Sequence, residues 1–275
     1  MQIRIRPWAQ LGLGAVLAAG VVAGCEAPKT VPVSEVAAQA ATQAAHPPPA
    51  APAQGGEGEG GVSIKAAATD AVVYATALGI VEAHVLAARD AYAAGQINAA
   101  AEMFAHPVSE ILYDLRPVLE ARGAEDFSNL LSEASAAVFA GEPVDQINRR
   151  TDGILAAVRA ASAMAPASNR SAALICASVS ADQVERAVRM YRAASGSGRY
   201  EPYLDGYGFY KAGLSGFAPC EDAIAAEAPQ AARAIRDALD LLAAAYPGAA
   251  SQPSLNADQA ALTVASSKAL LALGG

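Results

Sequence analysis

Apolar residues recur at helical spacing through most of the chain from about residue 64 onward. In the first such stretch Ala77, Ile80 and Val85 fall close to one helical face. Strands would require β-branched or aromatic residues alternating with polar ones, and this part of the chain lacks that alternation. The pattern therefore predicts an all-α domain over residues 62–275.

Glycine and proline interrupt this pattern at helix-length intervals. The longest helix is expected over residues 64–94, ended by Gly95. Proline fits the first position of a helix, so Pro107 is expected to open the helix 107–122 with His106 as its N-cap. The remaining expected helices are 97–105, 124–140, 143–164, 168–194, 200–217, 222–245 with a break at Pro229, and 257–273 after a cap at Asn256 or Ser254. About eight helices of this length predict an antiparallel bundle joined by short loops.

Residues 25–61 have a different composition, dominated by Ala, Pro, Gly, Gln and Glu. They include three consecutive prolines at 47–49 and five glycines within 55–61. Such a segment has too few large apolar side chains to offset the entropy lost on ordering. We expect a disordered tether between the N-terminus and the helical domain.

The N-terminus carries a basic segment and then an apolar run over residues 11–22. This run is shorter than the roughly 20 residues that a membrane-spanning helix needs. It ends in Val22-Ala23-Gly24-Cys25 and resembles a bacterial lipoprotein signal with its lipobox. The resemblance implies that residues 1–24 are removed and that Cys25 carries fatty acyl chains such as palmitate. An ordinary secretory signal is the alternative.

A lipoprotein signal also predicts where the protein works. Everything after Cys25 would lie on the periplasmic side of the cell envelope, held to a membrane by lipid. In lipoproteins of the enterobacterial type, an aspartate after the cysteine favours the inner membrane. Here Glu26 stands at that position, which favours the outer membrane.

The charge balance excludes one class of partner. The chain has 19 Lys and Arg against 27 Asp and Glu, a formal net charge of −8. Binding of nucleic acid, or adhesion to anionic lipid by charge, needs clustered basic residues that this chain lacks. The expected partners are the membrane, through the lipid anchor, and an envelope protein or a metal ligand.

Two cysteines remain in the predicted domain. In an oxidising compartment Cys176 and Cys220 predict a disulfide, while two reduced thiols are the alternative. Neither lies in a Cys-x-x-Cys motif or beside a histidine in sequence, so catalytic use is not expected.

Both histidines of the domain lie near carboxylates early in the helical region. Glu82 and His84 belong to the first long helix, and His106 and Glu110 follow it. If these helices pair as a hairpin, the two imidazoles could face each other. Imidazole and carboxylate together suit iron, zinc or manganese. The alternative is a capping histidine at 106 and a hydrogen-bonded, partly buried one at 84.

A second polar group lies in residues 200–211. Tyr203, Tyr207 and Tyr210 fall on one helical face, with Asp205 on a neighbouring face. Phenols with carboxylates could bind ferric iron or line a polar cleft. The alternative is that the tyrosines fill an alanine-rich core while their hydroxyls reach water or backbone carbonyls. Two glycines in this stretch indicate that its backbone approaches another element closely.

The lipoprotein signal, the tether, the helical domain and the early histidine–carboxylate cluster together resemble the imelysin-like proteins, periplasmic helical proteins associated with iron. That family is marked by Gly-x-His-x-x-Glu, whereas residues 79–84 hold those residue types in another order, so no residue role is carried over. The resemblance implies metal-linked binding and not peptide-bond hydrolysis.

No signature of nucleophilic catalysis or phosphate binding is present in the sequence. We therefore expect a non-enzymatic, lipid-anchored binding or scaffold domain of the cell envelope. The alternative function is a periplasmic protein that binds iron or another transition metal through His84, His106 and neighbouring carboxylates.

Overall fold

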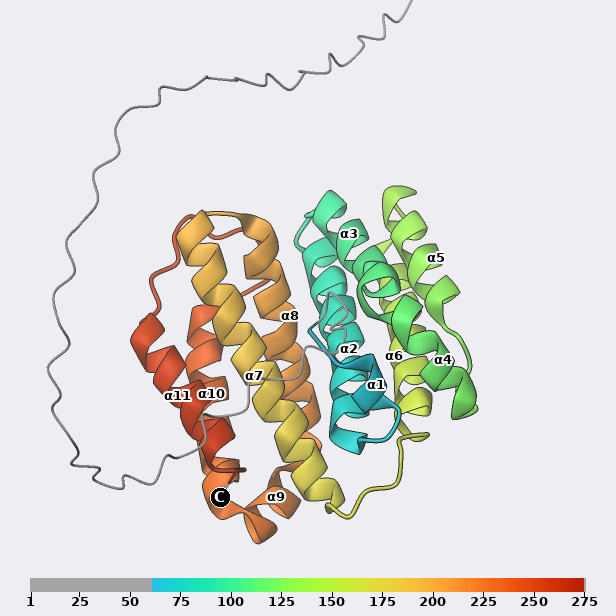
Figure 1. The fold of residues 1–275 in the computed structure, drawn as a ribbon. Coiled ribbons are helices and arrows are strands. Elements are labelled where there is room, and N and C mark those ends of the chain that lie inside the picture. The colour runs from blue at the N-terminus through green and yellow to red at the C-terminus, as the bar shows by residue number, and fades with distance from the viewer. Residues whose placement is uncertain (1–60, 275) are drawn as a thin grey trace, which may run out of the picture. The chain divides into compact units, whose positions relative to one another are not determined.

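The structure is a computed structural model that describes residues 61–274. The regular elements of this part of the chain are helices, with no strand among the described residues, which confirms the all-α prediction (Figure 1). The α-helices are α1 (Ile64–Ala67), α2 (Ala71–Ala93), α3 (Ile97–Pro107), α4 (Tyr113–Ala121), α5 (Ser128–Phe139), α6 (Val144–Ser162), α7 (Ala172–Ser197), α8 (Tyr200–Phe217), α9 (Glu221–Glu227), α10 (Pro229–Ala245) and α11 (Gln259–Leu271). A π-helical turn, η1 (Val108–Leu112), joins α3 to α4, and a 3-10 turn, η2 (Ala218–Cys220), joins α8 to α9.

Helix caps explain where several boundaries differ from those expected. The Asp70 side chain accepts hydrogen bonds from the backbone N–H groups of Val72 and Val73, so a new helix begins there and the expected helix 64–94 is divided into α1 and α2. The longest described helix is therefore α7, with 26 residues. Asp258 caps α11, in place of the expected Asn256 or Ser254.

The expectation that His106 is an N-cap is wrong. His106 lies in the last turn of α3, which continues through Pro107 into the π-helical turn. Proline has no N–H and its ring collides with the carbonyl four residues earlier, so a regular helix cannot pass through it undisturbed. The wider π-helical turn absorbs the disturbance without ending the helix.

Helix α2 is the central element of this bundle. It packs against α3, α6, α7 and α8, while α7 also contacts α8, α10 and α11 (Figure 1). Of the described helices, α2 alone is long and apolar enough to cross a membrane, and 72% of its most apolar window is buried inside the bundle. Its hydrophobic surface is thus covered by the neighbouring helices.

Glycines bring α8 close to its neighbours, as the sequence predicted. A Cβ atom added at Gly208 would lie 2.4 Å from the carbonyl oxygen of Ala83 on α2, and one added at Gly206 would lie 1.8 Å from the hydroxyl of Tyr246. Only glycine fits at such separations. Helices α2 and α8 are therefore in backbone contact one residue from His84.

Candidate metal centre

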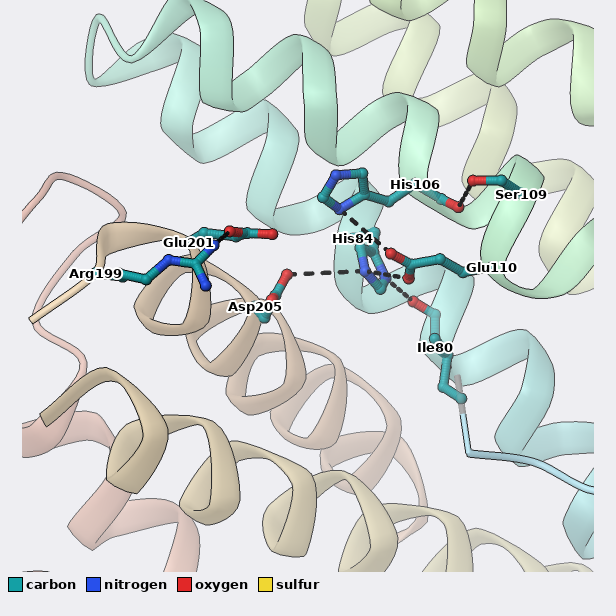
Figure 2. Close-up of polar contacts among 8 residues, drawn as sticks. All are labelled: Ile80, His84, His106, Ser109, Glu110, Arg199, Glu201 and Asp205. Carbon is teal, nitrogen blue, oxygen red and sulfur yellow. Dashed lines mark hydrogen bonds and ion pairs between the residues drawn. The ribbon is translucent and has the colours of Figure 1, made fainter. Parts of the chain in front are cut away.

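Four side chains from separate turns of the bundle converge beside α2. His84 comes from the middle of α2, His106 from the last turn of α3, Glu110 from η1 and Asp205 from α8 (Figure 2). Three of these residues were expected from the sequence to lie together. Asp205 was instead grouped with the tyrosines of its own helix.

The imidazole of His84 is held in one orientation. The residue is 5% exposed, and its Nδ1 lies 2.9 Å from the carbonyl oxygen of Ile80. A carbonyl oxygen only accepts, so Nδ1 carries the proton and Nε2 is directed at the carboxylates with its lone pair available when the ring is neutral. Metal-binding histidines in proteins are commonly oriented by such a bond to a backbone carbonyl.

Two carboxylates face Nε2 of His84. It lies 3.4 Å from Oε2 of Glu110 and 3.8 Å from Oδ1 of Asp205. Burial alone would lower the pKa of His84, but Glu110 and Asp205 outweigh it and raise that pKa above its ordinary value. His84 is thus attracted to both acids, yet the separations exceed those of strong charge-assisted hydrogen bonds.

Glu110 reaches both histidines. Its Oε1 lies 3.6 Å from Nδ1 of His106, and the ring centroids of His84 and His106 are 5.9 Å apart. Its bond with His84 lowers the pKa of the Glu110 carboxyl, against the effect of burial, and the charge of His106 adds to this. The π-helical turn sets the position of Glu110, and such turns are frequent at functional sites.

Asp205 is the least satisfied member of the cluster. Its Oδ1 is buried and has no hydrogen-bond partner among the described residues. Burial raises the pKa of this carboxyl; His84 and His106 act in the opposite direction, and Glu110 and Glu201 raise it further. A buried carboxylate oxygen without a partner costs folding free energy, so this position is one that a cation would stabilise.

The spacing of the donor atoms approaches that of a metal site. One ligand atom each from His84, His106 and Asp205 can be chosen so that all lie within 4.8 Å of one another. Ligands at about 2.1 Å from a tetrahedral zinc ion are separated from each other by about 3.4 Å. The grouped atoms lie up to 4.8 Å apart, so a bound ion would have to draw them closer together.

Glu82, the fourth residue of the expected metal group, does not join the cluster. It lies two residues from His84 on α2 and turns toward another part of the bundle, where its carboxyl accepts a hydrogen bond from Ser215. Burial raises the pKa of Glu82, and Ser215 and Arg159 partly offset this. Residues two apart on a helix point in different directions, which accounts for the separation.

Of the tyrosines expected to form a cleft with Asp205, Tyr203 and Tyr207 are buried in the core and Tyr210 packs against it partly buried. The hydroxyl of Tyr203 donates to the carbonyl of Gly248 at 2.7 Å, and that of Tyr207 donates to Asp90 at 2.7 Å. Tyr210 stacks on Tyr246 with 6.3 Å between centroids. These contacts agree with the alternative interpretation, in which tyrosines fill an alanine-rich core while their hydroxyls reach polar atoms.

Cys176 at the start of α7 and Cys220 in η2 form a disulfide, with 6.6 Å between their Cα atoms. The bridge closes a sequence separation of 44 residues and ties the beginning of α7 to the end of α8. Cys25, the expected signal 1–24 and the expected tether to residue 60 lie outside the described residues.

Comparison of the chain with models of known protein families, with curated proteins and with solved structures finds no significant match.

Proposed function

We propose that this chain is a cell-envelope protein whose helical domain binds a transition-metal ion through His84, His106 and Asp205, with Glu110 as a fourth ligand. The role is binding, without catalysis of a reaction. The proposal adopts the alternative function that the sequence offered, transition-metal binding, in place of the more general binding or scaffold role. Two imidazoles and two carboxylates suit iron, zinc or manganese.

The observation that carries this proposal is the buried Oδ1 of Asp205, which accepts no hydrogen bond among the described residues. A simple ion pair between His84 and Glu110 would account for the raised pKa of the histidine and the lowered pKa of the glutamate. It would not account for the second carboxylate, that of Asp205, whose buried Oδ1 lies 3.8 Å from the same nitrogen and accepts no hydrogen bond among the described residues. A shared cation satisfies all four groups together.

The location in the envelope is supported by the N-terminal sequence and by the disulfide. The lipobox-like segment ending in Cys25 predicts a lipid anchor, and disulfides persist mainly outside the reducing cytosol. We propose that the anchor holds the metal-binding domain on the periplasmic side, at the outer membrane. Mass spectrometry of the native polypeptide tests this, since an intact leader or an unmodified Cys25 would contradict it.

Metal binding is tested on the full chain purified in detergent. After dialysis against zinc or, anaerobically, ferrous iron, we expect about one ion per chain by elemental analysis. The double variant His84→Ala, His106→Ala should retain none while its helical circular dichroism is unchanged. Glu102→Gln, an exposed position on α3, is the matched control and should bind as the unaltered chain does. Equal metal content in all three proteins, or none in any, would refute the proposal.

A further inference from the structure

A separate pocket of about 260 Å³ lies at the end of the bundle where α7 ends and α8 begins. The segment between α10 and α11 closes its third side and reaches both helix ends (Figure 1). Among the described residues, those that line it include none of the four members of the candidate metal centre. The pocket is therefore a second place in the domain where a ligand can bind.

The pocket has little net charge although the chain is acidic. Its described lining contains no Asp or Glu, and the one charged side chain there, Arg199, pairs with Glu201. A helix C-terminus carries partial negative charge and a helix N-terminus partial positive charge, so the ends of α7 and α8 offset each other at this pocket. The lining therefore favours a neutral ligand over an ion.

Neutral hydrogen-bonding groups form one part of the lining. They are the hydroxyls of Ser195, Ser251 and Ser254 and the amide of Gln252. The Oγ of Ser195 is buried and makes no hydrogen bond among the described residues. A buried hydroxyl without a partner is unfavourable, and a serine hydroxyl turns about a single bond. Ser195 can thus pair with a hydroxyl group of a ligand in the pocket.

Two tyrosine rings of α8 form an apolar part of the lining. Tyr200 and Tyr203 stack with 6.3 Å between their ring centroids and 27° between their planes. The Tyr200 hydroxyl donates to the carbonyl of Ala249, and that of Tyr203 donates to the carbonyl of Gly248 at 2.7 Å. Both rings are held in place by these bonds. Tyr203 is almost wholly buried and Tyr200 only partly, so Tyr200 presents the accessible ring surface.

We propose that this pocket binds one neutral sugar ring, either free or as part of a glycan. A sugar ring has hydroxyl groups around its edge and a face of C–H bonds, so it matches both parts of the lining. The C–H face packs on an aromatic ring because the face of that ring carries partial negative charge. Pockets for drug-sized molecules begin at about 300 Å³, so a volume of about 260 Å³ limits the ligand to about one ring.

Saturation-transfer NMR with glucose, galactose and N-acetylglucosamine tests this on the full chain. The detergent must lack a sugar headgroup, and EDTA is present to remove any metal. We expect at least one of the three sugars to bind, and inorganic phosphate at the same concentration should not displace it. Co-sedimentation with purified peptidoglycan distinguishes a ring within a glycan from a free sugar. Binding of none of these four probes, or displacement of the sugar by phosphate, overturns the inference.

Two pairs of variants place the binding in this pocket. Tyr200→Ala should weaken sugar binding by about fivefold to tenfold, whereas Tyr200→Phe keeps the ring and should bind nearly as the unaltered chain does. Ser195→Ala should weaken binding by about fivefold, and Ser197→Ala, at an exposed position two residues later, is the matched control.

Ser195→Ala removes no hydrogen bond that the described residues make, so it keeps the test decisive if Tyr200→Ala does not fold. Unchanged binding by Tyr200→Ala, or equal binding by the variants at 195 and 197, overturns the inference. Because EDTA is present throughout, these outcomes leave the proposed metal site untouched, and failure of the metal site leaves the sugar site untouched.

Discussion

Replacing Asp205 by asparagine should weaken metal binding without destabilising the metal-free protein. The substitution removes a charge and keeps nearly the same shape. Burial raises the pKa of Asp205, so the native state binds the proton more tightly than the unfolded chain does. The stability that this proton provides is present at low pH and is lost as the pH rises through the folded pKa, so at pH 7 the ionised carboxylate reduces stability.

The magnitude follows from the environment of the carboxylate. A buried acceptor without a partner costs about 1–3 kcal/mol, and Oδ1 of Asp205 is such an atom. In chelator, we expect the free energy of unfolding of the Asp205→Asn variant to equal that of the unaltered chain or to exceed it by about 1 kcal/mol, which corresponds to about 2–4 °C in melting temperature. An ion at a hundred times its Kd stabilises the unaltered chain by about 2.7 kcal/mol, and the variant should gain much less.

Thermal unfolding followed by circular dichroism, first in EDTA and then in excess zinc, measures both effects. Asp152→Asn, at an exposed position of α6, is the control and should behave as the unaltered chain in both conditions. A variant at 205 that melts several degrees lower in EDTA would show that Asp205 stabilises the fold through His84. In that case the argument from an unsatisfied carboxylate is refuted.

Three further predictions concern packing, the disulfide and pH. Gly208→Ala should destabilise the fold by about 1–3 kcal/mol and weaken zinc binding, whereas Gly216→Ala on the same helix, where an added Cβ meets nothing closer than 3.9 Å, should be neutral or stabilising by urea unfolding. Reducing the Cys176–Cys220 bridge should lower the free energy of unfolding by about 4 kcal/mol for its 44-residue separation, and an unchanged urea midpoint in dithiothreitol would contradict this. Burial lowers the pKa of His84, but Glu110 and Asp205 outweigh burial and raise that pKa above 6.5. Because a protonated ring cannot bind zinc, zinc affinity should begin to fall, as the pH is lowered, while the pH is still above 6.5. A zinc Kd that stays constant down to pH 6 would be inconsistent with this prediction.

The helical architecture was predictable because its signals are local. Gly95, Gly123 and Gly141 end helices in the structure with φ values of 77°, 74° and 70°, and Pro229 opens α10. The break at Asp70 was missed because an aspartate with helical periodicity on both sides is compatible with either a cap or a continuous helix. Packing of α1 and α2 against different neighbours decides between them, and that information is not local.

The site was only partly predictable for the same reason. His84, His106 and Glu110 lie within 27 residues of one another on adjacent helices, so a hairpin brings them together. Asp205 comes 95 residues after Glu110 along the chain, and nothing in its own helix identifies its partner. The available signal was the glycine pair that follows it, since close approach of α8 to another helix carries Asp205 with it.

The contact between α2 and α8 explains how the bundle can maintain an unsatisfied carboxylate. Asp205 and Gly208 are three residues apart and share one face of α8. On that face Gly208 meets the backbone of α2, and the neighbouring Tyr207 donates a hydrogen bond to Asp90 further along α2. These two contacts keep α8 from rotating about its axis in a direction that would expose Asp205 further to solvent. Because the helix is held in this orientation, the carboxylate of Asp205 stays directed at His84, which is the arrangement that the proposed cation site requires.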